Sequence, residues 1–403
     1  MIVNEKNILN YTVLGVFLLL WSTQASLLAG EIARYGSLFF GLFFVATILF
    51  KRKFLRREIR FFTICFLFLI GYVMIAIIQE QDTIDILQLS FFFINFILLC
   101  VGYSLGLKSN LNLKISKRII FIITFLAIIG SLKFLQLQAK TFAEGLIDRH
   151  SEGNHLSAIG IAYVNSLLIL LLFWLFKNTH THKIKYLIIL AILLTFFVLI
   201  STTSRGAILY LVIIFMLHNF RGQRFKLLFF NIFKSIIFIF FFYVVIFFVA
   251  QEIPVIKFKL DGITERFSTL VTFLEAADGD ASASGRQDFY SSFFNDFNDF
   301  ILLGKYKYIP YPHNQFLEII MRWGVFGFPL LFYSITNIFR ALNFFKKKTI
   351  NQNKLLLLIL PLFLFSYFQS MTSLSLEMNR MLWLGFGFIS SFVTINNKAI
   401  IKA

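Results

Sequence analysis

Residues 186–220 read YLIILAILLTFFVLISTTSRGAILYLVIIFMLHNF, in which the polar sequence TTSRG at 202–206 separates two apolar runs. The stretch contains one Lys or Arg, Arg205, and neither Asp nor Glu. Apolar runs that approach about 20 residues are typical of helices that cross the hydrocarbon core of a bilayer. The stretch therefore predicts two short membrane helices joined by a tight polar turn.

The same pattern recurs along the whole chain of 403 residues. Hydrophobic residues make up 58% of the sequence, 56 residues are Phe, and the mean hydropathy is +0.80, which is more apolar surface than a soluble globule can bury. We therefore predict an all-α, polytopic membrane protein with about 12 transmembrane helices. The predicted spans are 9–29, 34–50, 61–78, 86–107, 119–137, 157–176, 186–201, 207–220, 227–250, 316–335, 355–374 and 381–396.

The net charge is +18, but the basic residues lie in short loops between apolar runs. This distribution is typical of membrane-protein topology and does not indicate a nucleic-acid partner. With the N-terminus in the cytoplasm, 24 Lys and Arg fall in cytoplasmic segments and five in short outer loops. An excess of basic residues in short cytoplasmic loops sets the orientation of a membrane protein. The sequence thus predicts that both termini are cytoplasmic.

One long polar segment, residues 251–315, lies between the ninth and tenth predicted spans. It holds six Lys or Arg and nine Asp or Glu, so it lacks the basic bias of a cytoplasmic loop. Phe289, Phe293 and Phe297 recur at helical spacing and predict an amphipathic helix along the membrane surface. We predict a single membrane domain over 1–403, with 251–315 inserted as an external loop that contains amphipathic helices.

Arg205 lies at the predicted outer boundary between two spans, followed by Gly206. A guanidinium there can clamp an anion, because it offers two parallel hydrogen bonds to phosphate oxygens. The alternative is an arginine that anchors a tight hairpin by reaching to the interface. Arg286 offers the same choice, between a membrane-surface anion ligand and a solvated charge beside Asp288.

The loop re-enters the membrane through Tyr311-Pro312-His313-Asn314, followed by Gln-Phe-Leu-Glu at 315–318. His313 or Asn314 falls beside the N-cap of the next helix, where free N–H groups favour an anion. A histidine at this position is suited to act as a general acid or base. The alternative is an N-cap Asn with an incidental neighbour. Arg322, two turns further on, is a candidate to face the same cavity.

Asp278 and Asp280 have the spacing of metal–nucleotide ligands in some glycosyltransferases, but this Gly-rich segment is better interpreted as a flexible turn. Neither a metal nor a cofactor is predicted.

These motifs, in their order and on a shared face, resemble the O-antigen ligase/polymerase family (Wzy-type polymerases and WaaL-type ligases). The resemblance rests on Thr203-Ser204-Arg205-Gly206-Ala207, on Gly285-Arg286 with Phe294 and Gly304, and on 313–318 with Gly324 and Gly327. It implies a metal-independent glycosyltransferase in the bacterial inner membrane, with its active site on the periplasmic face. Its donor and acceptor would be undecaprenyl-diphosphate-linked oligosaccharides, with a chain-length regulator and a flippase as further partners.

By this resemblance His313, Arg286 and Arg205 are the catalytic residues, and Arg266, Asn314, Tyr311 and Arg322 bind the diphosphate or the glycan. The sequence of residues 311–318 favours an O-antigen polymerase over a ligase that transfers the glycan to lipid A–core. A transporter or flippase is the alternative of another class. It is disfavoured because transporters place acidic residues and sites near the bilayer midplane, whereas the polar residues here cluster at one face.

Overall fold

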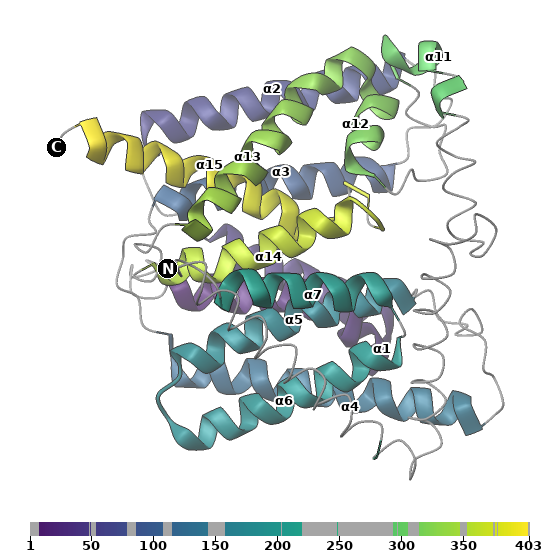
Figure 1. The fold of residues 1–403 in the computed structure, drawn as a ribbon, viewed down its shortest axis with the longest axis vertical. Helices are drawn as coiled ribbons and strands as arrows, with labels where there is room; N and C mark the ends of the chain where they lie inside the picture. Colours follow the sequence, from purple (N-terminus) through teal and green to yellow (C-terminus); the bar gives the residue numbers. More distant parts are fainter. Residues whose placement is uncertain are drawn as a thin grey trace.

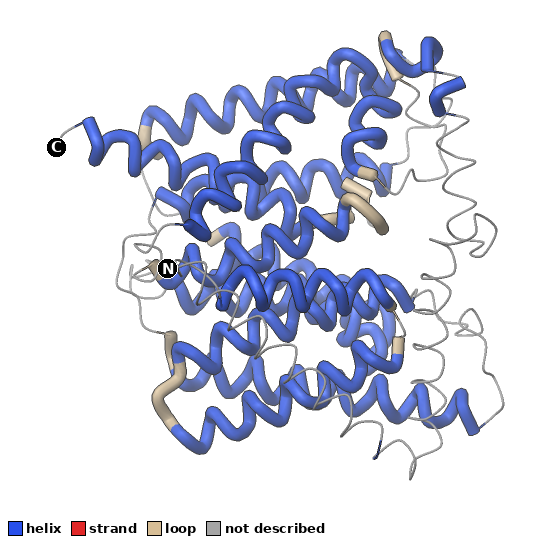
Figure 2. The backbone as a smooth tube through the Cα atoms, viewed as in Figure 1, coloured by secondary structure: helices blue, strands red, loops and turns tan. Residues whose placement is uncertain are grey.

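The computed structural model describes residues 8–47, 49, 54–78, 86–107, 115–143, 158–202, 204–219, 248, 293–295, 297–304, 314–346, 353–373, 375–376 and 378–401. In this part of the chain the regular structure is entirely helical (Figure 2), which confirms the predicted all-α class. The elements are α1 (Ile8–Ala46), α2 (Arg56–Ile78), α3 (Ile86–Leu107), α4 (Lys117–Ala143), α5 (Ala158–Asn178), α6 (His182–Ser201), α7 (Arg205–Asn219), α11 (Phe297–Ile301), α12 (Gln315–Trp323), η3 (Gly324–Gly327), α13 (Phe328–Lys346), α14 (Lys354–Ser370) and α15 (Arg380–Ile401).

Several helices are long and apolar enough to cross a membrane. Six described segments satisfy both criteria, and α7, α14 and the 92–107 part of α3 are shorter apolar helices. Helix α2 exposes large apolar side chains: Phe66, Leu67 and Met74 are 45%, 61% and 50% exposed. An apolar surface of this extent is stable against lipid and not against water. The chain is therefore a multi-pass membrane protein.

The predicted spans that the structure describes fall on helices, with differences at their ends and one interruption. The spans at 9–29 and 34–50 form the two halves of α1, which is broken at Ala29 and Gly30, where the backbone leaves helical geometry. The Oγ of Ser37 donates to the carbonyl of Leu18 at 2.8 Å, so the second half folds back on the first. The span predicted at 227–250 and most of the predicted loop 251–315 lie outside the described residues.

The span predicted at 316–335 is not one continuous helix. Helix α12 ends at Trp323, and Gly324 adopts a φ of 56°, in the left-handed region that only glycine enters readily. A Cβ at Gly324 would lie 2.5 Å from the carbonyl oxygen of Leu302, so the turn at 302–304 also requires glycine here. The membrane helix α13 then begins at Phe328 and runs beyond the predicted end to Lys346.

Apart from α1, which packs against α3, α4 and α5, the long helices form two groups with α14 between them (Figure 1). One group contains α2, α3, α13 and α15, and the other contains α4, α5, α6 and α7; α14 packs against members of both. Within the first group α3 and α15 approach very closely, because Gly102 and Gly106 of α3 and Gly387 of α15 admit the backbone of the partner helix. In Figure 1 the short helix α12 runs across the direction of α2 and α3.

Candidate active site

The turn between α6 and α7 places Arg205 at the first residue of a helix. Ser204 precedes it, and the carbonyl of Ser204 accepts from the amide of Ile208 at 3.3 Å. Thr202 and Ser204 are buried, whereas Arg205 is half-buried. The first turn of a helix carries free N–H groups and the positive end of its dipole. Arg205 therefore adds a full positive charge to an end of α7 that already favours an anion.

Gly206 gives a tyrosine of another helix access to this turn. A Cβ at Gly206 would lie 2.9 Å from the Oη of Tyr163, a residue of α5. That contact is tighter than van der Waals packing allows, so the position of the Tyr163 hydroxyl depends on the absence of a side chain at 206. The group that approaches Gly206 in the structure is thus the hydroxyl of Tyr163.

Two tyrosine hydroxyls hold the turn that follows α14. The Oη of Tyr163 donates to the Oγ of Ser373 at 3.0 Å, and the Oη of Tyr210, one turn into α7, donates to the Oγ1 of Thr372 at 3.0 Å. The amide of Ser373 in turn donates to the carbonyl of Gln369 at 2.9 Å. The start of α7 and the outgoing end of α14 are thus fixed to each other by side-chain hydrogen bonds.

The same end of α14 also holds the start of α12. The Oγ of Ser370 donates to the Oε1 of Gln315 at 2.6 Å, and the Nε2 of Gln315 donates to the Oγ of Ser334 on α13 at 2.7 Å. All three side chains are fully buried. Because buried polar groups are costly unless paired, this chain of bonds fixes the first residue of α12 between α13 and α14.

Asn314 is the N-cap of α12, as one interpretation of the sequence expected. Its Oδ1 accepts from the amides of Phe316 at 2.9 Å and Leu317 at 3.3 Å. This cap sets the direction of the chain just before α12. His313 and Tyr311 come immediately before it in the sequence and lie outside the described residues, as do Arg266 and Arg286.

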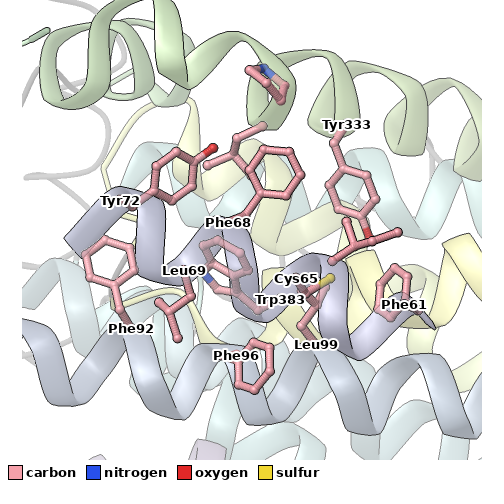
Figure 3. Close-up of a pocket in the computed structure, with 13 residues that line it drawn as sticks. Phe61, Cys65, Phe68, Leu69, Tyr72, Phe92, Phe96, Leu99, Tyr333 and Trp383 are labelled. Carbon is pink, nitrogen blue, oxygen red and sulfur yellow. The ribbon is translucent and has the colours of Figure 1, made fainter. Parts of the chain in front are cut away.

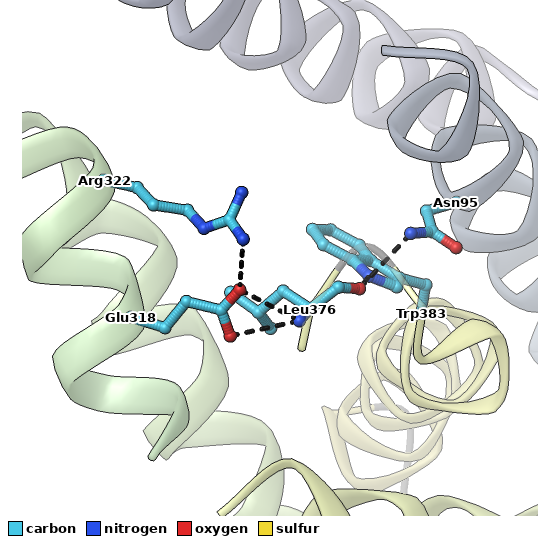
Figure 4. Close-up of polar contacts among 5 residues, drawn as sticks. All are labelled: Asn95, Glu318, Arg322, Leu376 and Trp383. Carbon is cyan, nitrogen blue, oxygen red and sulfur yellow. Dashed lines mark hydrogen bonds and ion pairs between the residues drawn. The ribbon is translucent and has the colours of Figure 1, made fainter. Parts of the chain in front are cut away.

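Arg322 is held by a buried carboxylate one turn earlier on α12 (Figure 4). Its Nη2 lies 3.0 Å from the Oε1 of Glu318, and the two side chains are 7% and 0% exposed. Both oxygens of Glu318 also accept from the amide of Leu376, at 3.1 and 3.2 Å. The predicted contact between Arg322 and the substrate stays a prediction; the contact in the structure ties α12 to the loop between α14 and α15.

The carbonyl of Leu376 is held as firmly as its amide. It accepts from the Nε1 of Trp383 at 2.8 Å and from the Nδ2 of Asn95 on α3 at 3.3 Å (Figure 4). The loop after α14 is thus hydrogen-bonded to α3, α5, α7, α12 and α15. This loop was not predicted to take part in a site, although its run of polar residues between two apolar helices was visible at 370–379.

Of the predicted site residues that the structure describes, Arg205 and Asn314 each begin or cap a helix that hydrogen bonds fix to the end of α14. Tyr163, Tyr210, Ser370, Thr372 and Ser373 make these connections. The result is two helix N-termini beside a hydroxyl-rich turn, an arrangement that can bind an anionic and polyhydroxylated ligand.

The fold and the described contacts define a class: a multi-pass helical membrane protein in which two helix N-termini are hydrogen-bonded to one hydroxyl-rich turn. The sequence model of the O-antigen ligase family matches residues 189–332, which include α7, α12 and the Arg205 turn. This match confirms the resemblance to the O-antigen ligase/polymerase family, whose members are enzymes of glycosyl transfer with lipid-linked glycans as substrates in a membrane. No curated protein and no solved structure gives a significant match.

Proposed function

We propose that this protein is a glycosyltransferase of the bacterial inner membrane that polymerises O-antigen, or a related surface polysaccharide, from undecaprenyl-diphosphate-linked repeat units. The observation that carries the proposal is the hydrogen-bonded connection of the α7 start, with Arg205, to the α12 start, with Asn314, through the end of α14. Two motifs that are about 110 residues apart in the sequence are thereby fixed to the same end of one helix.

The chemistry needs two kinds of group, and the chain offers both. The bond that breaks joins the anomeric carbon of the donor sugar to an oxygen of the diphosphate, and negative charge develops on the leaving diphosphate. Guanidinium groups held in place before the reaction stabilise that charge, which is the role proposed for Arg205 and Arg286. The new bond forms from an acceptor hydroxyl oxygen, whose proton passes to His313. These side chains perform the transfer without a metal.

The remaining predicted residues have binding roles in this proposal. Arg266 and Arg322 contribute positive charge toward the diphosphate or the glycan, Tyr311 offers a ring and a hydroxyl to a sugar, and Asn314 holds the direction of the segment that carries His313. The distribution of basic residues supports a periplasmic site with both termini in the cytoplasm. A chain-length regulator and a flippase are the further protein partners proposed.

A second candidate function is that of an O-antigen ligase, which transfers the glycan to lipid A–core. The observation that favours it is the description of the matched family, O-antigen ligase. The two activities share the donor and the chemistry and differ in the acceptor.

The glycan profile of a deletion strain separates the two. If the protein is the polymerase, its loss leaves one repeat unit on lipid A–core, and a plasmid copy restores long chains. If it is the ligase, its loss leaves bare core and polymer on the carrier lipid. A deletion strain with a wild-type profile of every surface glycan would contradict both.

A further inference from the structure

An apolar cavity of about 180 Å³ lies among α2, α3, α13 and α15 (Figure 3). Its walls include Leu69 and Tyr72 from α2, Phe96 from α3, Leu330 from α13 and Trp383 from α15. None of the lining residues carries a charge. A cavity lined in this way binds hydrocarbon and offers few partners to water.

The cavity adjoins the surface that faces lipid. Ile64 and Phe68 line it, yet 54% and 44% of their surface is exposed. Leu67, on the same helix, is 61% exposed and is not a lining residue. A hydrocarbon chain can therefore pass from the bilayer past Ile64 and Phe68 into the cavity without crossing a polar barrier.

Residues of the cavity wall also contact the polar cluster around Leu376. Tyr72 stacks on Trp323 with ring centroids 4.5 Å apart, and Trp323 directly follows Arg322 on α12. Trp383 lines the cavity and donates to the carbonyl of Leu376, whose amide donates to Glu318. An amphipathic molecule can thus keep its apolar part in the cavity while its polar part lies toward α12.

We propose that this cavity binds a segment of the isoprenoid tail of the lipid-linked saccharide. This inference rests on the proposed function, because that function supplies a ligand with a polyprenyl tail and a diphosphate head. The tail then positions the head: burial of the chain among α2, α3, α13 and α15 keeps the diphosphate near α12. An ordinary phospholipid lacks the diphosphate, and it is an alternative occupant that the test distinguishes.

The test compares two substitutions in α2 at positions that point to different sides of the helix. Leu69→Trp fills the cavity, and Leu67→Trp places the same side chain into lipid two residues away. The full-length protein in nanodiscs is titrated with undecaprenyl diphosphate, inorganic diphosphate and phosphatidylglycerol. We expect Leu69→Trp to weaken undecaprenyl diphosphate binding about tenfold, the loss of two or so buried methylene groups, and Leu67→Trp to bind as wild type.

Inorganic diphosphate is expected to bind both variants and the wild type equally. Undiminished binding of undecaprenyl diphosphate to Leu69→Trp overturns the inference and leaves the proposed function standing. A wild type that does not prefer undecaprenyl diphosphate over phosphatidylglycerol contradicts the proposed function itself.

A second measurement uses the unaltered protein, so it does not depend on the folding of a variant. Undecaprenyl diphosphate with a photoreactive group in its tail is bound and irradiated, and the labelled peptides are identified. Label at the lining residues of α2, α3, α13 or α15 supports the inference. Label confined to other helices overturns it.

Discussion

Ser370, the last residue of α14, donates a hydrogen bond of 2.6 Å from its Oγ to the Oε1 of Gln315, the first residue of α12. The two residues are 55 positions apart in the sequence and both are fully buried. Since Gln315 also donates to Ser334, one amide side chain connects three helices directly after the cap residue Asn314, which follows the segment proposed to carry His313.

The first prediction concerns this amide. In Gln315→Leu the hydroxyl of Ser334 loses its Gln315 donor and that of Ser370 keeps only the carbonyl of Tyr367 as an acceptor, both in a buried place, which costs about 1–3 kcal/mol. We expect a lower melting temperature for the purified protein in detergent. Ser26→Ala is the control, because among the described residues the Oγ of Ser26 bonds only the carbonyl of Thr23 in its own helix. Equal melting temperatures of Gln315→Leu and the control would contradict the role of Gln315 in connecting α12, α13 and α14.

The second prediction concerns Gly206. Alanine at this position brings a Cβ to 2.9 Å from the Oη of Tyr163, so the hydroxyl that donates to Ser373 must shift. We expect Gly206→Ala to reduce glycan polymerisation in cells, with unchanged amounts of protein in the membrane.

The double variant Gly206→Ala with Tyr163→Phe supplies the sharper readout. It has no hydroxyl at 163 and therefore no clash, so it should be at least as active as Gly206→Ala alone. Gly71→Ala is the matched control, because a Cβ there meets nothing within 4 Å. If Gly206→Ala behaves as this control does, Gly206 has no positioning role.

The third prediction concerns the ion pair on α12. Removal of one partner leaves a buried charge without its counter-charge, which costs about 3–5 kcal/mol. Glu318→Gln or Arg322→Met alone should therefore lower the melting temperature strongly. The double variant should recover much of the loss, because no buried charge then remains.

The exposed pair of Glu31 and Arg34 provides the comparison for this prediction. Its closest atoms lie 3.1 Å apart with side chains 48% and 26% exposed, and exposed pairs contribute about 0–1 kcal/mol. Substitution of Glu31 by Gln should hardly change the melting temperature. A Glu318→Gln variant that melts like Glu31→Gln would show that the buried pair does not hold α12 to the loop.

The positions of the membrane helices were predictable because they follow from hydropathy alone. The span predicted at 86–107 is α3, Ile86–Leu107, and the spans at 157–176 and 186–201 differ from α5 and α6 by a few residues. The break at Gly324 was not predictable in this way, because the apolar run continues through it and the left-handed φ leaves no trace in hydropathy. The count of twelve spans stays a prediction, since the span at 227–250 lies outside the described residues.

The candidate site was predictable only at its helix starts. Asn314 could be expected as a cap because Asn is a common N-cap residue, and the structure confirms it. Tyr163 and Ser373 are 210 residues apart, and no local pattern relates them. The pair of Glu318 and Arg322 had a local signal, the i, i+4 spacing on one helix, which predicts a bond between them before it predicts a ligand for Arg322.

The central claim is that the α7 start and the segment before α12 act as one transferring site. Its most direct test is the rate of polymer formation from purified undecaprenyl-diphosphate-linked repeat units by the wild type, Arg205→Ala, His313→Ala and the double variant. We expect the rate of each single variant to fall by about 10²–10³-fold, as when a preorganised stabilising group is removed. The fold-loss in rate of the double variant should be far smaller than the product of the two single losses, because groups of one site act together. Wild-type rates for Arg205→Ala, or losses that multiply fully, would contradict the claim.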